Sequence, residues 1–331
     1  MTDDESRGVP KIVGTGWAVP SKIRLNDDPI FDWLHAHQPP GSNLFQGYRD
    51  RRVLSDHESL ETILVPAARR AVEASGIDPK EIDLVLGTAS VSPYESPDTL
   101  AKLPASLGLS PRGLTIPLYD DFSNFNSGLL IADAMIRAGR ARHALVACAS
   151  SWTRFVDYHT PQAVSAADGA GAAVVSRTTR PGFEIVDTET ITDASWFGSM
   201  YMAGDLVPGS DPPLFTSPTF HITERGQQGF SVFGMNAPPE AANALLARNG
   251  LKGGDVSLVS HQASSVLLDA WKAAIDPHQY LQTLVEFANV TVANIPLSLA
   301  YLYERIERDH VVLLAIGTEM HTNALLLRRT A

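Results

Sequence analysis

The sequence predicts a layered α/β fold built from two similar halves. Three observations predict it: helical patterns alternate with short strands, the strands are continuously apolar, and two stretches of the first half recur in the second. Continuously apolar strands are typical of sheets that helices cover on both faces. The runs with this character are residues 83–88, 144–149, 256–260 and 311–316.

The recurrence indicates an internal duplication. Residues 76–90 align without gaps with residues 250–264, and each stretch follows an Ala-rich helical pattern and begins with glycine. Glycine after a helical pattern is a helix stop signal, and the apolar run that follows is a strand signal. Residues 126–149 align in the same order with residues 294–317, as a helix followed by a buried strand. We therefore expect one half at residues 1–178 and the other at residues 179–331.

Composition excludes several classes of function. The 331 residues are 44% apolar and 19% charged, which is enough to bury a large core. No run of about 18 apolar residues is present and the first ten residues are polar, so no membrane partner is expected and the cytoplasm is the expected location. The single cysteine excludes an internal disulfide, and no metal site is expected from the His and Cys spacing. A net charge of -11 argues against a nucleic acid partner.

The turn at residues 121–128, DFSNFNSG, leads from a predicted strand at residues 114–118 into a helix. A helix N-terminus offers free amides and a partial positive charge, which can lower the pKa of a thiol or hold an oxyanion. Asn126 lies two residues before the glycine of this turn. A carboxamide has no thiolate form and is not a useful nucleophile.

Two further residues stand at element ends in the second half. His261 follows a predicted strand in the motif VSHQAS, and Asn289 lies in ANVTVANIPL before a helix. An isolated histidine at a strand end is more often structural, and an asparagine before a helix is usually a cap. Three other motifs extend across the chain, namely KIVGTG at 11–16, GYRDRR at 47–52 and ADGAGAA at 167–173.

Together these motifs resemble those of the β-ketoacyl synthase III group in the thiolase superfamily, over nearly the whole chain. The resemblance implies the thiolase fold, in which two duplicated halves form five αβαβα layers. In this group a cysteine, at the place we assign to Asn126, takes an acyl group from a thioester. The counterparts of His261 and Asn289 stabilise the enolate formed when a malonyl thioester loses carbon dioxide. The resemblance also implies a homodimer, no permanently bound cofactor, and a coenzyme A or phosphopantetheine thioester as substrate.

The missing cysteine changes the expected chemistry. Covalent condensation through residue 126 is excluded, and the only cysteine, Cys148, is expected to pack in the core of an apolar strand. Ser127 is the better of two flanking serines as a replacement nucleophile, provided that its hydroxyl lies within about 3 Å of His261.

Further residues are expected to bind substrate. Gln227 and Phe230, in GQQGF, resemble the family's pantetheine-contacting motif. Trp196 belongs to a long connection at residues 191–225, and connections of this length often form lids or binding loops. Arg154 matches a cofactor-contacting arginine of the family when a gap is allowed. Glu319 and His321 replace small residues of a glycine loop, where they form either an extra acid/base pair or a solvated surface.

The leading interpretation is a ketosynthase III-like acyltransferase in secondary metabolism that works without a covalent acyl-cysteine. In one version, His261 is the general base for a hydroxyl or amine acceptor that attacks the thioester directly, and this version is preferred. In the other, His261 and Asn289 promote decarboxylation of a malonyl thioester. An acyl carrier protein is a further possible partner. The alternatives are a non-catalytic subunit that forms a heterodimer with an active ketosynthase, and a binding protein for a small acyl compound.

Overall fold

The computed structural model describes residues 8–94, 96–214 and 216–330. Each half of the chain contributes five strands to one ten-stranded arrangement. The first half supplies β1 (Val9–Ala18), β4 (Leu84–Ser90), β5 (Leu114–Pro117), β6 (His143–Ser150) and β7 (Gly169–Thr178). The second half supplies β8 (Gly182–Thr192), β11 (Val256–Ser260), β12 (Gln279–Leu281), β13 (His310–Gly317) and β14 (His321–Thr330).

The two halves have the same strand topology. From the centre outward the first half runs β1-β7-β6-β4-β5 and the second runs β8-β14-β13-β11-β12, with β1 and β8 paired at the junction. In each half the inner pairings are antiparallel and the outer ones, β6-β4-β5 and β13-β11-β12, are parallel. Two parallel outer pairings joined by helices reproduce the expected duplication. The predicted division at 178/179 falls between β7 and β8 and stays a prediction.

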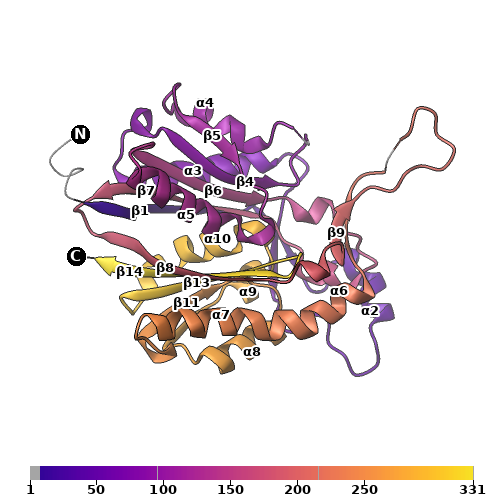
Figure 1. The fold of residues 1–331 in the computed structure, drawn as a ribbon. Helices are drawn as coiled ribbons and strands as arrows, with labels where there is room; N and C mark the ends of the chain where they lie inside the picture. Colours follow the sequence, from indigo (N-terminus) through magenta and orange to yellow (C-terminus); the bar gives the residue numbers. More distant parts are fainter. Residues whose placement is uncertain (1–7, 95, 215, 331) are drawn as a thin grey trace.

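Helices complete five layers (Figure 1). The five strands of the first half form the first sheet layer, and the five strands of the second half form the second. Helix α3 (Leu60–Ser75) covers the outer face of the first sheet, and α7 (Met235–Arg248) with α8 (Ser265–Ile275) covers the outer face of the second. Helices α5 (Asn124–Arg137) and α10 (Asn294–Tyr301) lie between the sheets. Because α10 is enclosed on both sides, its first six residues are all buried. The predicted thiolase-like fold is confirmed.

The helix boundaries follow from local signals. Ser59 and Thr62 form a capping box at the start of α3. Gly76 ends the same helix in the left-handed conformation, at φ 65°, as its sequence position predicts. The remaining elements are short: β2 (Lys22–Leu25), α2 (Asp32–His37), β3 (Asp50–Val53), α4 (Leu103–Leu107), β9 (Met200–Ala203), β10 (Thr219–Ile222), α6 (Glu224–Gly229) and α9 (Leu284–Phe287).

The connection at residues 191–225 contains the two-stranded sheet β9-β10. The chain between these strands, described at residues 204–214 and 216–218, projects from the body of the molecule (Figure 1). Within the described residues, no helix is long and apolar enough to cross a membrane.

Candidate active site

A cavity of about 780 Å³ lies where the ends of the central helices meet β9-β10 and the segment after β11. This volume is within the usual range for a ligand pocket, about 300 to 1,000 Å³. Among the described residues that line it, none is Asp, Glu, Lys or Arg, and many are apolar or aromatic. The residues used below are Phe122, Gln227, Phe230, His261, Asn289 and Thr291. The described lining is therefore uncharged and largely apolar.

His261 and Asn289 are joined by the buried side chain of Asn294, at the start of α10. The Asn294 amide nitrogen lies 3.1 Å from His261 Nδ1 and donates to Asn289 Oδ1 at 2.7 Å. The Asn294 carbonyl oxygen accepts from the Val290 N–H at 2.9 Å, which fixes the orientation of the carboxamide. Because the nitrogen of Asn294 is the donor, Nδ1 of His261 must be the acceptor.

This hydrogen bond sets the proton positions in the site. With Nδ1 as acceptor, the neutral His261 imidazole carries its proton on Nε2. Burial lowers the pKa of His261 to about 3, partly offset by the Asp121 carboxylate, so the ring is neutral at physiological pH. Nε2 makes no hydrogen bond to any described residue. His261 therefore offers the cavity an N–H donor.

The Asn289 side chain is also held with its donor toward the cavity. Its Oδ1 accepts from the Thr291 N–H at 2.8 Å as well as from Asn294, so its amide nitrogen is left to face the cavity. Its backbone is held by hydrogen bonds to Ser165 and Ala167. The preceding Ala288 has φ 51° and ψ -145°, a conformation that favours glycine and costs an alanine about 1 to 3 kcal/mol. Such strain is common where a backbone positions a functional side chain.

Phe122, and not Asn126, is the residue of the turn before α5 that lies against His261. The two rings are parallel, with centroids 5.0 Å apart and an interplanar angle of 4°. Phe122 lines the cavity, and Asp121 before it has a positive φ of 45°. The placement of Asn126 in the site was wrong, because α5 begins at Asn124 and residue 126 is already in its first turn.

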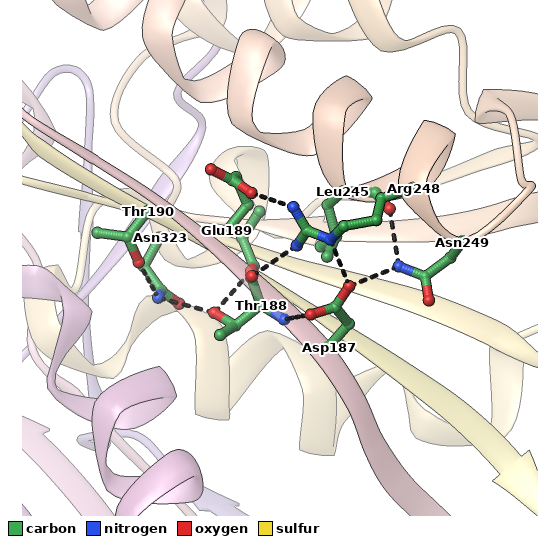
Figure 2. A network of polar contacts seen from close by, with 9 residues as sticks. Asp187, Thr188, Glu189, Thr190, Leu245, Arg248, Asn249 and Asn323 are labelled. Carbon is green, nitrogen blue, oxygen red and sulfur yellow. Dashed lines mark hydrogen bonds and ion pairs between the residues drawn. The ribbon is translucent and has the colours of Figure 1, made fainter.

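Asn126 lies in α5, and its side chain is buried against β13 and β14 of the second sheet. Its amide nitrogen donates to Leu313 O at 3.2 Å and to Asn323 Oδ1 at 3.1 Å, and it does not line the cavity. Asn323 is itself held by Thr188 and Thr190 at 3.2 and 3.0 Å. Figure 2 shows the contacts of Asn323 with Thr188 and Thr190, beside a surface network in which Arg248 and Asn249, at the end of α7, bind Asp187. Asn126 thus joins the layers of the fold.

Ser127 does not replace the nucleophile. Its hydroxyl donates to the Asp120 carboxylate, and it does not line the cavity. Cys148 is fully buried in β6, as expected, and burial raises the pKa of its thiol to about 12. Neither side chain can attack a thioester in the cavity.

Glu319 and His321 do not form a pair with each other. Glu319 hydrogen bonds to Asp121, and burial together with that neighbouring carboxyl raises the pKa of Glu319 to about 8. His321 bonds through Nδ1 to the Thr192 hydroxyl at 2.9 Å, and its Nε2 lies 3.9 Å from Asp120. Both side chains therefore contact the aspartates before α5 and lie outside the cavity lining.

The expected substrate-binding residues divide into two groups. Gln227 and Phe230 line the cavity, and Phe230 begins a π-helical turn, a feature frequent at functional sites. Trp196 donates from Nε1 to Asp193, and Arg154 binds the carbonyl oxygens of Ser55 and Glu58. The last two do not line the cavity, and their contact with substrate stays a prediction.

Sequence reasoning missed two residues of the site, Phe122 and Asn294. The repeat alignment paired Asn126 with Asn294, whereas the first residues of α5 and α10 pair Asn124 with Asn294. If the two halves are aligned at the first residues of α5 and α10, the residue expected to face the site moves from Asn126 toward Phe122. The described residues contain no group of three or more His, Cys, Asp or Glu side chains that could hold a metal ion.

Comparisons with known proteins agree with this architecture. Residues 121–194 match the family model 3-Oxoacyl-[acyl-carrier-protein (ACP)] synthase III, and residues 246–329 match the model of its C-terminal part. Among curated proteins, the β-ketoacyl-[acyl-carrier-protein] synthase III of Rhodospirillum rubrum is 30% identical, over 84% of this chain and 87% of that protein. The corresponding protein of Rhodospirillum centenum is 29% identical, over 96% of this chain and 98% of its own length.

Among solved structures, the priming β-ketosynthase from the R1128 polyketide biosynthetic pathway superposes with a TM-score of 0.84 at 24% identity, over 97% of both chains. At that identity the superposition speaks for the fold alone. The sequence matches carry the assignment further, because they extend over most of both chains and include the turn before α5 and the strand-end histidine. The chain belongs to the β-ketoacyl-[acyl-carrier-protein] synthase III family.

Proposed function

We propose that this chain decarboxylates a malonyl-type thioester without forming an acyl-enzyme. The observation that carries the proposal is the orientation of Asn294, which leaves His261 Nε2–H and the Asn289 amide nitrogen as two donors facing one cavity. Two such donors can bind the thioester carbonyl oxygen and stabilise negative charge that develops on it.

The reaction balances with these two groups and one water molecule, which supplies a proton and leaves as hydroxide. The bond between the malonyl carboxylate and the α-carbon breaks, carbon dioxide leaves, and the electron pair passes into the enolate of the thioester. The enolate oxygen is held by His261 and Asn289, and protonation of the α-carbon by water gives the acetyl-type thioester. Neither residue has to change its own protonation state.

The uncharged cavity favours this step. A carboxylate without an ion-pair partner is costly to bury, whereas the departing carbon dioxide is neutral. No described lining residue carries a full charge that would neutralise the carboxylate. The thioester arm is taken to be coenzyme A or phosphopantetheine, in line with the carrier-protein synthases among the relatives, and Gln227 is the proposed contact for its amide groups.

The same hydrogen bonds argue against the direct acyl transfer that the sequence favoured. A general base needs a free lone pair toward the acceptor, but the Asn294 hydrogen bond places the proton of His261 on the cavity side. A pKa of about 3 makes this imidazole a weak base as well. A role in secondary metabolism is a further prediction that follows from the altered centre.

Two observations favour a second candidate, a non-catalytic subunit of an active ketosynthase. The ring of Phe122 covers His261, where an incoming acyl group would need space. The edge strand β5 also leaves Leu114, Ile116 and the nearby Tyr119 exposed, as an interface with a homologous chain, or with a second copy, would require.

The test is turnover of malonyl-coenzyme A and of a malonyl phosphopantetheine arm by the purified chain, followed by mass spectrometry of the acetyl product. We expect His261→Ala and Asn289→Ala each to lower the rate about 100- to 1,000-fold, the usual effect of removing one oxyanion donor. Ser127→Ala is the control, because its hydroxyl lies outside the cavity. Equal rates in the wild type and His261→Ala would exclude the mechanism, and no wild-type turnover would favour the partner subunit.

A further inference from the structure

A second cavity, of about 240 Å³, lies behind the wall of the first. Tyr48 and Asn289 line the first cavity, whereas Arg49 and Phe287, which lie close to them in the sequence, line the second. No residue lines both cavities. The walls of the second comprise Trp17, Val19, Arg49, Asp50, Arg52, Glu286, Phe287 and Tyr301.

Three aromatic rings make one side of this second cavity apolar. Tyr301 meets both Trp17 and Phe287 edge to face, each with ring centroids 5.0 Å apart. Phe287 is buried, whereas Trp17 and Tyr301 are half-buried. The Tyr301 hydroxyl makes no hydrogen bond within the described part of the chain. The wall thus combines apolar surface with one free hydroxyl.

The four charged side chains divide into a satisfied pair and two unpaired groups. Arg49 binds the Asp50 carboxylate, with Nη2 3.1 Å from Oδ2. Arg52 makes no side-chain hydrogen bond or ion pair with any residue described, and its Nε is buried without a partner. The Glu286 carboxylate likewise has no hydrogen bond or ion pair with any residue described, although its charge acts on Arg49.

An unpaired guanidinium nitrogen in a buried position is costly, because it has lost water without gaining an acceptor. A ligand carboxylate in the cavity would bind the two terminal Nη groups of Arg52, which likewise have no partner among the described residues, in the bidentate geometry that arginine prefers. A bound anion alone would leave Glu286 unpaired beside new negative charge, whereas a ligand ammonium group would compensate it.

We propose that this second cavity binds a small zwitterion, an α-amino acid with an apolar side chain. Its carboxylate binds Arg52, its ammonium group faces Glu286, and its side chain packs on the wall of Trp17, Phe287 and Tyr301. The volume is below the usual range for drug-sized ligands, which restricts the ligand to a molecule about the size of an amino acid. The proposal is independent of the decarboxylase activity.

The test is isothermal titration of the full chain with three probes of similar shape: L-phenylalanine, 3-phenylpropionate and phenethylamine. We expect saturable binding of L-phenylalanine and weaker binding of the two probes that lack one charge. Arg52→Gln and Glu286→Gln should each weaken L-phenylalanine binding about tenfold or more, the usual value of a hydrogen bond to a charged group.

Arg305→Gln is the matched control, since Arg305 lies over the Tyr301 ring at 5.7 Å and does not line the cavity. If Arg52→Gln lowers the melting temperature too far for titration, Tyr301→Phe removes only the free hydroxyl and should weaken binding about threefold. Absence of saturable L-phenylalanine binding would overturn the proposal. So would tighter binding of 3-phenylpropionate, or equal affinity in the wild type and Arg52→Gln.

Discussion

The two turns that precede the central helices have the same backbone conformation, but their side chains make different interactions. Each is a short 3-10 turn with a positive-φ residue, Asp121 before α5 and Thr291 before α10, and each leads into a helix that begins with asparagine. In the second half, Asn294 orients His261 and Asn289. In the first half, Asn124 donates only to Leu118 O at 2.8 Å, and its carbonyl oxygen has no partner.

The two turns thus share the backbone that positions their side chains but differ in the reactive groups that they carry. The duplicated backbone is kept in both halves, so the scaffold alone does not determine the chemistry. The second-half turn supplies the hydrogen-bond donors, whereas the first-half turn presents the unreactive ring of Phe122 to the same cavity. In the proposed function, the site polarises a thioester and does not accept an acyl group.

The largest expected effect comes from truncating the asparagine of each turn. Asn294→Ala releases both His261 and Asn289, and we expect decarboxylation to fall about 100-fold or more, because two donors lose their orientation. Asn124→Ala removes one hydrogen bond outside the site, so the rate should stay within about twofold while stability falls by about 1 kcal/mol. Parallel rate and urea-unfolding measurements check both, and equal rate losses would show that the turns are not chemically distinct.

A smaller effect is expected in the pH dependence of stability. The folded-state pKa of His261, about 3, is below its ordinary value of 6.5, so the unfolded chain takes up the proton first as the pH falls. The stabilisation is complete above pH 6.5 and is lost toward pH 3, by at most about 1.4 kcal/mol per pH unit. His261→Gln should lose less stability than the wild type between pH 7 and 5 in urea unfolding. Identical slopes would mean that His261 is not buried as a neutral ring.

The smallest effect concerns the first-half turn. The folded-state pKa of Glu319, about 8, is above its ordinary 4.5, so its contribution is complete below pH 4.5 and is lost as the pH rises through 8. Glu319→Gln should therefore gain about 1 kcal/mol over the wild type at pH 9 relative to pH 5. The exposed Glu304 provides the control, as Glu304→Gln should leave this difference unchanged.

The fold and half of the site were predictable from the sequence. The apolar strands and the repeat predicted the layers of the fold. The two motifs that contain His261 and Asn289 identified two residues that do line the cavity. The register of the first-half turn was not predictable, because the 3-10 turn at 121–123 moves the helix start to Asn124. The contacts of Glu319 and His321 were not predictable either, because their partners Asp121 and Thr192 are distant in sequence.

The most direct test of this account is the reactivity of a cysteine placed at each candidate position of the first-half turn. Phe122→Cys and Asn126→Cys are treated with iodoacetamide and then, separately, with acetyl-coenzyme A, and adducts are read by intact-protein mass spectrometry. The native Cys148 should give little background, since its thiol is buried and has a pKa of about 12. We expect rapid labelling and self-acylation of Phe122→Cys and neither in Asn126→Cys. Labelling of Asn126→Cys with an inert Phe122→Cys would contradict this account.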